Sequence, residues 1–240
     1  MKNKFLIISI LISFGSYSQN PLISEDSFKQ KEWVDRIYNN LSLDERIGQL
    51  YTVWVATRYG EEEIEHISKL IRDYHLGGLI FSLGNIKDQA IAINKFQKLS
   101  KVPLLISMDA EWGIGMRLDD AFSFPYNMTL GAVEDNELIY KVGKRIGQHA
   151  NRLGVHINFA PVVDINTNPD NPIIGSRSFG EDKYNVADKA LSYMKGMQSK
   201  NLLGSAKHFP GHGDTKTDSH YTLPLISFSE ERIDSIELYP

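Results

Sequence analysis

The sequence predicts an α/β fold in which a parallel β-sheet is covered by helices. Short apolar runs alternate with longer amphipathic patterns, the runs are apolar on both faces as buried parallel strands are, and polar segments rich in Gly and Pro follow several of them. The 240 residues, 42% hydrophobic and 23% charged, are typical of a globular protein with a real core. Because α/β barrels of this length commonly form one unit, we expect one domain after the N-terminal segment.

Residues 1–19 are typical of a secretory signal peptide. Lys2 and Lys4 give a positively charged start, an apolar stretch covers residues 5–14, and Ser16 and Ser18 are small residues suited to a cleavage site. The apolar stretch is short for a bilayer span, although a buried helix or a retained membrane anchor is an alternative interpretation. We therefore expect a periplasmic or secreted protein with no stable membrane insertion after cleavage.

The later elements are assigned from hydrophobic periodicity, in chain order. Apolar residues with helical spacing predict a lead-in helix within residues 20–40, and Ser42 with Glu45 forms a capping box that starts the next element. Five βα rounds are expected within residues 41–240. The predicted strands cover residues 51–56, 77–82, 102–109, 155–165 and 202–209. The predicted helices cover residues 61–75, 86–100, 135–153 and 182–200, and another helical pattern begins at residue 229.

Composition excludes several classes of protein. Lys and Arg number 26 against 30 Asp and Glu, the formal net charge is -4, and no basic block is present, so a nucleic-acid partner is not expected. The absence of cysteine excludes disulfides, thiolate metal sites and cysteine nucleophiles. It also leaves the apolar N-terminal stretch without a residue for a lipid anchor.

The segment after the fifth predicted strand, KHFPGHGDTKTDSH at residues 207–220, is unusually rich in histidine and aspartate. A metal site is one interpretation of this composition. Pro210 and Gly211 lie between His208 and His212, however, and they prevent the helical spacing that would place two histidines side by side as ligands. We therefore expect no metal in this loop.

Acid/base chemistry is a second interpretation of the same loop. Asp218 and His220 are two residues apart, so in an extended segment their side chains point the same way and the carboxylate holds the imidazole. Such a pair fixes the tautomer of a histidine that gives and takes a proton. The alternative is that Asp218 caps a turn and His220 is a partly exposed loop residue.

Further charged residues follow other predicted strands. Lys207 and His208 come at the end of the fifth strand, and Asp109, Arg117 and Arg177 lie in the segments after earlier strands. The carboxyl ends of parallel strands meet at one end of the sheet, so these side chains are expected to converge on one pocket. Each alone is more often a surface charge or an ion-pair partner, but together they suit a polyhydroxylated ligand.

Three segments resemble glycoside hydrolase family 3, in particular its β-N-acetylglucosaminidase (β-hexosaminidase) branch. They are MDAEWGIGMR at residues 108–117, GSRSFG at 175–180 and KHFPGHGDTKTDSH at 207–220, and the resemblance covers residue 41 to the end. It implies a (β/α)8 TIM-barrel-type domain, present here as about five βα units from the N-terminal part of the catalytic domain. It also implies no metal or organic cofactor. The family often has an arginine where this chain has Ile114.

The resemblance also implies an activity and site roles. The activity is that of a retaining exo-glycosidase acting on terminal β-linked N-acetylglucosamine in cell-wall (peptidoglycan) or related amino-sugar oligosaccharides. It makes His220 the general acid/base and Asp218 its partner. The sugar-binding residues it implies are Asp109, Arg117, Arg177, Lys207 and His208.

The family nucleophile is an aspartate on a later strand, which is therefore expected beyond residue 240. We accordingly expect this chain to be C-terminally truncated, with further C-terminal domains in a longer protein. The alternatives are a β-glucosidase-type member of the same family or a non-catalytic sugar-binding fragment.

Overall fold

The computed structural model describes residues 26–240, and the predicted signal peptide lies outside this range. The chain divides into two units, with the boundary after Leu41. In the first unit, α1 (Ser27–Asn39) starts at Asp26, whose side chain accepts a hydrogen bond from the Lys29 N–H. Within residues 26–240, none of the helices has the length and hydrophobicity that crossing a membrane requires.

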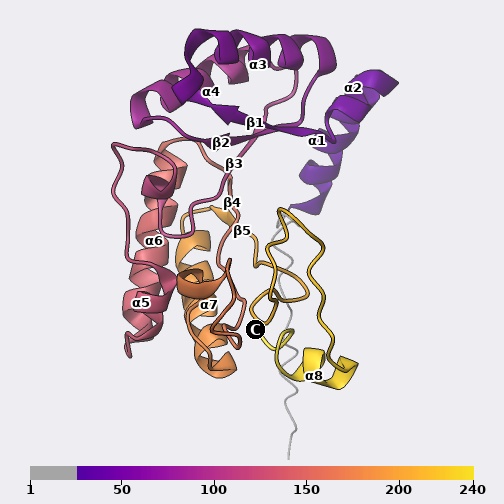
Figure 1. Cartoon of the computed structure of the whole chain (residues 1–240). Coiled ribbons are helices and arrows are strands. Elements are labelled where there is room, and N and C mark those ends of the chain that lie inside the picture. The colour runs from indigo at the N-terminus through magenta and orange to yellow at the C-terminus, as the bar shows by residue number, and fades with distance from the viewer. Residues whose placement is uncertain (1–25) are drawn as a thin grey trace, which may run out of the picture. The chain divides into compact units, whose positions relative to one another are not determined.

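The second unit contains a five-stranded parallel sheet with the sequential order β1-β2-β3-β4-β5 (Figure 1). Parallel strands in sequential order are the arrangement of a TIM-barrel-type fold, so the predicted fold class is confirmed. The strands are β1 (Thr52–Ala56), β2 (Gly78–Ser82), β3 (Leu105–Met108), β4 (Ile157–Asn158) and β5 (Leu203–Gly204).

Helices connect successive strands, as the periodicity predicted. The short α2 begins with the predicted capping box, in which the Ser42 hydroxyl accepts from the Glu45 N–H and the Glu45 carboxylate accepts from the Ser42 N–H. The α-helices of this unit are α2 (Leu43–Gly48), α3 (Gly60–Tyr74), α4 (Ile86–Leu99), α5 (Asn127–Gly131), α6 (Asn136–Arg152), α7 (Lys183–Gln198) and α8 (Glu230–Ser235). Three single-turn 3₁₀ helices are η1 (Thr57–Tyr59), η2 (Ile114–Met116) and η3 (Gly175–Arg177).

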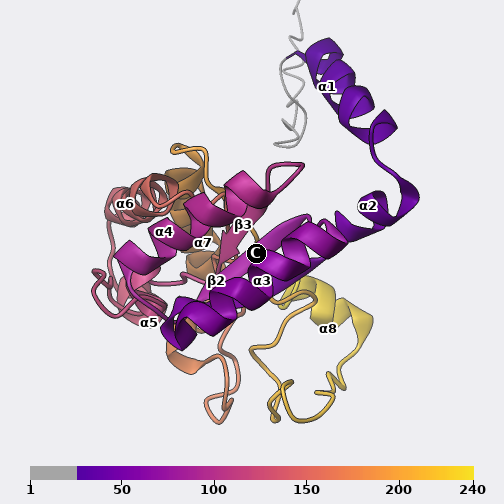
Figure 2. The ribbon, with the colours of Figure 1, turned by 90° about the horizontal axis from the view of Figure 1, so that it is seen from above.

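The two faces of the sheet have different environments. Val55, Phe81 and Met108 lie opposite one another on adjacent strands and are completely buried in the core that the helices cover. In Figure 2, α3 and α4 run alongside the sheet on this side. On the other face, Trp54 and Leu105 are about half exposed. The prediction that the strands are buried on both faces therefore holds only for the helix-covered side.

The fourth and fifth strands are much shorter than the apolar runs predicted. The peptide N–H of Ala160 bonds back to the carbonyl of Asn158, and Pro161 has no N–H to donate, so the ladder is interrupted after Asn158. Pairing then resumes as an isolated bridge between Val162 and Lys207. This bridge places Lys207 at the carboxyl end of the sheet.

Helices α6 and α7 pack closely because glycines remove side chains from their interface. A Cβ on Gly196 would lie 2.2 Å from the Tyr140 carbonyl oxygen and 2.7 Å from the Lys144 nitrogen. A Cβ on Gly143 would lie 2.1 Å from the Tyr193 carbonyl oxygen. Backbone atoms cannot move aside as a flexible side chain does, so both positions require glycine.

We expect Gly196→Ala to lower the free energy of unfolding by about 1–3 kcal/mol, because the added methyl group forces the two helices apart. Urea denaturation monitored by circular dichroism measures this change. Gly147→Ala, where the nearest backbone atom lies 2.9 Å away, is a milder substitution in the same interface and should cost less. Equal stability of Gly196→Ala and the unsubstituted protein would show that the interface is looser than described.

Candidate active site

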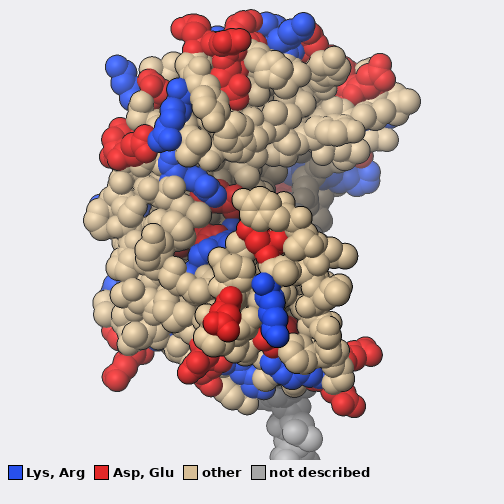
Figure 3. Space-filling model, in the orientation of Figure 1, with Lys and Arg blue, Asp and Glu red and all other residues tan. Residues whose placement is uncertain are grey.

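A polar cavity of about 430 Å³ lies at the carboxyl ends of the strands. Six of the seven site residues predicted from the sequence line it, and Asp218 contacts one of them, His220. The lining residues are Asp109, Glu111, Met116, Arg117, Ile173, Arg177, Lys207, His208, His212, Ser219 and His220. Figure 3 shows acidic and basic side chains interspersed over one face of the molecule, and they also meet in a hollow near its middle.

The backbone that carries Asp109 is held by the neighbouring strand. The amide of Asn158, at the end of β4, accepts from the Ala110 N–H at 2.9 Å and donates to the Ala110 carbonyl at 3.1 Å. Asn158 is completely buried, so both amide groups are used without competition from water. This double hydrogen bond fixes the chain where it leaves β3.

Two carboxylates and three cations form a connected network in the cavity. The Lys207 ammonium lies 2.8 Å from an oxygen of Asp109 and 2.8 Å from an oxygen of Glu111. The Arg177 guanidinium donates two hydrogen bonds to Glu111, at 2.7 and 3.0 Å. Arg117 donates to the Asp109 carbonyl at 2.9 Å and lies 3.3 Å from its carboxylate. The predicted sugar-binding residues are therefore brought together, although their predicted roles stay predictions.

Ion pairing outweighs burial in setting the pKa values of Glu111 and Arg177. Burial by itself would raise the pKa of Glu111, but hydrogen bonds from Arg177 and the charge of Lys207 outweigh it, so the pKa lies below its ordinary value. Burial likewise would lower the pKa of Arg177, and the contact with Glu111 reverses this effect and raises it. Glu111 is therefore ionised at neutral pH.

The tautomer of His208 follows from its two partners. Its Nδ1 lies 2.6 Å from a carboxylate oxygen of the buried Asp164, and its Nε2 lies 3.2 Å from the Arg177 guanidinium. A guanidinium only donates, so Nε2 accepts and Nδ1 donates to Asp164. Asp164 also accepts from the His212 N–H at 2.6 Å. This carboxylate thus orders the start of the loop over residues 207–220.

Asp218 and His220 make the predicted side-chain contact, with 2.6 Å between a carboxylate oxygen and Nδ1. The expected extended geometry is wrong, however. The Asp218 carboxylate also accepts from the His220 N–H, and its carbonyl accepts from Tyr221 and Thr222, so the segment is a turn. Hydrogen bonding from the His220 N–H is the largest effect that lowers the pKa of Asp218. Asp218 therefore forms the turn and contacts the His220 side chain at the same time. The contact is made through Nδ1, so Nε2 of His220 does not bond Asp218.

Two buried carboxylates at or near this cavity had no role assigned from the sequence: Glu111, which lines it, and Asp164, which bonds the lining residue His208. Glu111 directly follows one apolar run and Asp164 lies within another. Acidic residues are rarely buried unless they are paired, so their position in the sequence could have indicated that each has a buried partner. His212, considered above as a metal ligand, is buried and bonds Thr215 and Ser219 through its two ring nitrogens. Ile114 is buried in the hydrophobic core and does not line the polar cavity.

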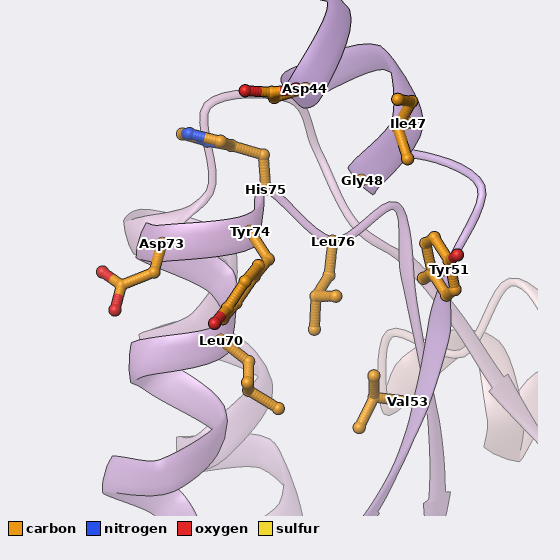
Figure 4. Close-up of a pocket in the computed structure, with 10 residues that line it drawn as sticks. All are labelled: Asp44, Ile47, Gly48, Tyr51, Val53, Leu70, Asp73, Tyr74, His75 and Leu76. Atoms are coloured by element: carbon orange, nitrogen blue, oxygen red, sulfur yellow. The ribbon is translucent and has the colours of Figure 1, made fainter.

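A larger cavity of about 590 Å³ lies at the opposite, amino-terminal ends of β1 and β2 (Figure 4). Most of its lining is apolar or aromatic, including Tyr51, Leu70, Tyr74 and Leu76. Its two carboxylates, Asp44 and Asp73, show no ion pair with each other or with a cation among the described contacts of the cavity. The polar network described above is therefore the better candidate for an active site.

A cavity of paired cations and carboxylates at the carboxyl ends of parallel strands, with a histidine–aspartate pair beside it, is the arrangement of an α/β-barrel protein that acts on polar ligands. The Glycosyl hydrolase family 3 N terminal domain matches residues 42–240. The chain therefore belongs to glycosyl hydrolase family 3, as its motifs indicated.

Named relatives and solved structures agree with this family. Beta-hexosaminidase A of Pseudoalteromonas piscicida is 38% identical over 187 residues, which cover 72% of this chain and 31% of the relative. The Beta-N-acetylglucosaminidase/beta-glucosidase of Cellulomonas fimi is 33% identical, with 84% of this chain and 35% of the relative covered.

Among solved structures, a family 3 beta-N-acetylglucosaminidase from Paenibacillus sp. FPU-7 superposes with a TM-score of 0.75 at 38% identity, over 83% of this chain and 39% of that one. A beta-glucoside phosphorylase, BglX, superposes with a TM-score of 0.81 at 25% identity, over 87% of this chain and 37% of that one. The chain thus spans between about 31% and 39% of the length of these proteins.

Proposed function

We propose that this chain supplies the sugar-binding and acid/base part of a retaining exo-glycosidase that hydrolyses terminal β-linked N-acetylglucosamine. The observation that carries the proposal is the polar cavity, in which a charged network lies next to the His220–Asp218 pair. The β-hexosaminidase and β-N-acetylglucosaminidase names of the relatives support this choice of sugar.

The charges around the cavity suit a neutral sugar better than an anion. Each cation lies within ion-pair distance of Asp109 or Glu111, so none of the three is left unpaired to attract an anionic ligand. The three cations are Arg117, Arg177 and Lys207, and a further carboxylate nearby, Asp164, pairs with His208. The remaining donor and acceptor positions of the lining side chains are of the kind that hydrogen-bond the hydroxyl groups of a pyranose ring.

In the proposed reaction, Nε2 of protonated His220 gives its proton to the glycosidic oxygen while the bond from that oxygen to the anomeric carbon breaks. A carboxylate nucleophile forms a bond to the same carbon. A water molecule then gives a proton to His220 while its oxygen bonds to the anomeric carbon and the bond from that carbon to the carboxylate breaks, which frees the nucleophile and releases the sugar with retained configuration. Asp109 and Glu111 are both paired with Lys207, so we propose that the nucleophile is an aspartate outside these 240 residues.

We also propose that the protein acts in the periplasm or outside the cell on cell-wall or related amino-sugar oligosaccharides. The charged start and apolar stretch of residues 1–19 support export. A β-glucosidase activity is the second candidate, because the Cellulomonas fimi relative carries both names. The third candidate function is sugar binding without turnover.

Chromogenic substrates test these candidates. Expressing the complete reading frame that contains this chain, alongside residues 20–240, and assaying each with the 4-nitrophenyl β-glycosides of N-acetylglucosamine and glucose gives four rates. We expect the product of the complete frame to release nitrophenol faster from the N-acetylglucosaminide. A preference for the glucoside would favour the second candidate, and sugar binding without turnover by either protein would favour the third.

A further inference from the structure

We propose that Glu111 is a positioning residue, which holds Arg177 and Lys207 in the geometry that binds the sugar. The inference rests on the proposed function of the cavity and adds a residue to which neither the sequence motifs nor the family assignment gave a role. Glu111 acts through the two cations, since only 1% of its side chain is exposed.

Both oxygens of the Glu111 carboxylate are occupied by these cations. One oxygen accepts from Arg177 at 2.7 Å and lies 2.8 Å from the Lys207 ammonium. The other accepts from the Arg177 Nε–H at 3.0 Å. A planar guanidinium bound by two parallel hydrogen bonds has one orientation, so Glu111 sets which N–H groups of Arg177 face the cavity.

The backbone of Glu111 is itself fixed from another element. The hydroxyl of Tyr193, on α7, donates to the Glu111 carbonyl at 2.9 Å, and Tyr193 is completely buried. The N–H and the carbonyl of the preceding residue, Ala110, both hydrogen-bond to the Asn158 side chain. The backbone that carries the Glu111 carboxylate is therefore fixed by hydrogen bonds from β4 and α7.

Without this carboxylate the two cations would have more freedom. Lysine and arginine side chains lose considerable rotamer entropy when a ligand orders them, and a preformed ion pair removes that cost before the ligand arrives. Lys207 would keep Asp109 as a partner, whereas Arg177 would lose its only described carboxylate contact within hydrogen-bonding distance. The main effect of removing Glu111 should therefore appear at Arg177.

Glu111→Gln tests the proposal, because glutamine keeps the shape and removes the charge. We expect the dissociation constant for N-acetylglucosamine, measured by calorimetric titration of the chain, to rise by about tenfold, the scale of one lost charge-assisted hydrogen bond. In an Arg177→Ala background the same substitution should change the affinity little, because the residue it positions is absent. Additive effects of the two substitutions would overturn the proposal.

A second readout needs no sugar. In ¹⁵N-correlated NMR spectra of the unsubstituted chain, the Arg177 Nε–H should be protected from solvent exchange, and in Glu111→Gln this protection should be lost. Glu45→Gln is the matched control, since Glu45 also pairs with a lysine, at 2.7 Å, and lies outside the cavity. That variant should keep both the affinity and the protected Arg177 signal.

The two readouts separate failure of this inference from failure of the proposed function. A protein that binds N-acetylglucosamine equally well with Glu or Gln at position 111, and keeps the protected Arg177 signal, would contradict the positioning role and leave the function standing. A protein that loses the signal in Glu111→Gln but never binds the sugar would contradict the proposed function and still support Glu111 as the residue that holds Arg177.

Discussion

Replacing His220 with alanine is expected to slow hydrolysis of β-N-acetylglucosaminides by about 10²–10⁴-fold, the usual contribution of a general acid/base. The fold should be retained, because 75% of the His220 side chain is exposed and, within residues 26–240, its only side-chain partner is Asp218 in the same turn. Removing the imidazole leaves the leaving-group oxygen without its proton donor. Steady-state kinetics on the product of the complete reading frame measures the loss.

The dependence on leaving group makes this test specific. A 4-nitrophenolate departs with little help from an acid, whereas a sugar alcohol needs its proton, so His220→Ala should lose more activity on a disaccharide than on the nitrophenyl substrate. His66→Ala, on the exposed side of α3, is the matched control and should leave both rates unchanged. An equal loss on both substrates would assign His220 a role other than proton donation.

Replacing Arg177 with alanine is expected to lower the free energy of unfolding by about 3–5 kcal/mol at neutral pH, because it leaves the charge of Glu111 buried with one partner fewer. Lys207 still contacts Glu111, which favours the lower part of this range. The double substitution Glu111→Gln with Arg177→Ala removes the stranded charge and should be more stable than Arg177→Ala alone.

The pH dependence of this effect has a definite sign. The pKa of Glu111 is lowered in the folded protein, so its stabilising contribution is present above the ordinary carboxyl pKa and is lost as the pH falls through the lowered value. The stability difference between the unsubstituted protein and Arg177→Ala should therefore shrink in acid.

Urea denaturation at several pH values measures this difference. Arg58→Ala is the control, because its ion pair with Asp119 is exposed and should contribute at most about 1 kcal/mol. A difference between the unsubstituted protein and Arg177→Ala that is the same at every pH would show that packing, and not the ion pair, accounts for the loss.

The sequence by itself determined the elements whose signals are local. Hydrophobic periodicity located α3 and α6 within two residues of their observed ends, and the Ser42–Glu45 capping box predicted the start of α2. The polar segments that follow the apolar runs predicted that Asp109 and Lys207 would lie in one pocket at the same end of the sheet. These predictions succeeded because helix caps, amphipathic faces and strand ends depend on residues close together in the chain.

Only the tertiary structure decided the partners of buried charges and the length of the last strands. Glu111 and Arg177 are 66 residues apart, and nothing in the segment around either one specifies the other as its partner. The apolar run at 155–165 became the two-residue strand β4, because Pro161 and the backbone contact from Ala160 to Asn158 interrupt the ladder. Pairing across such distances is set by the packing of whole elements, which brings buried charges together only when the sheet and its helices are assembled.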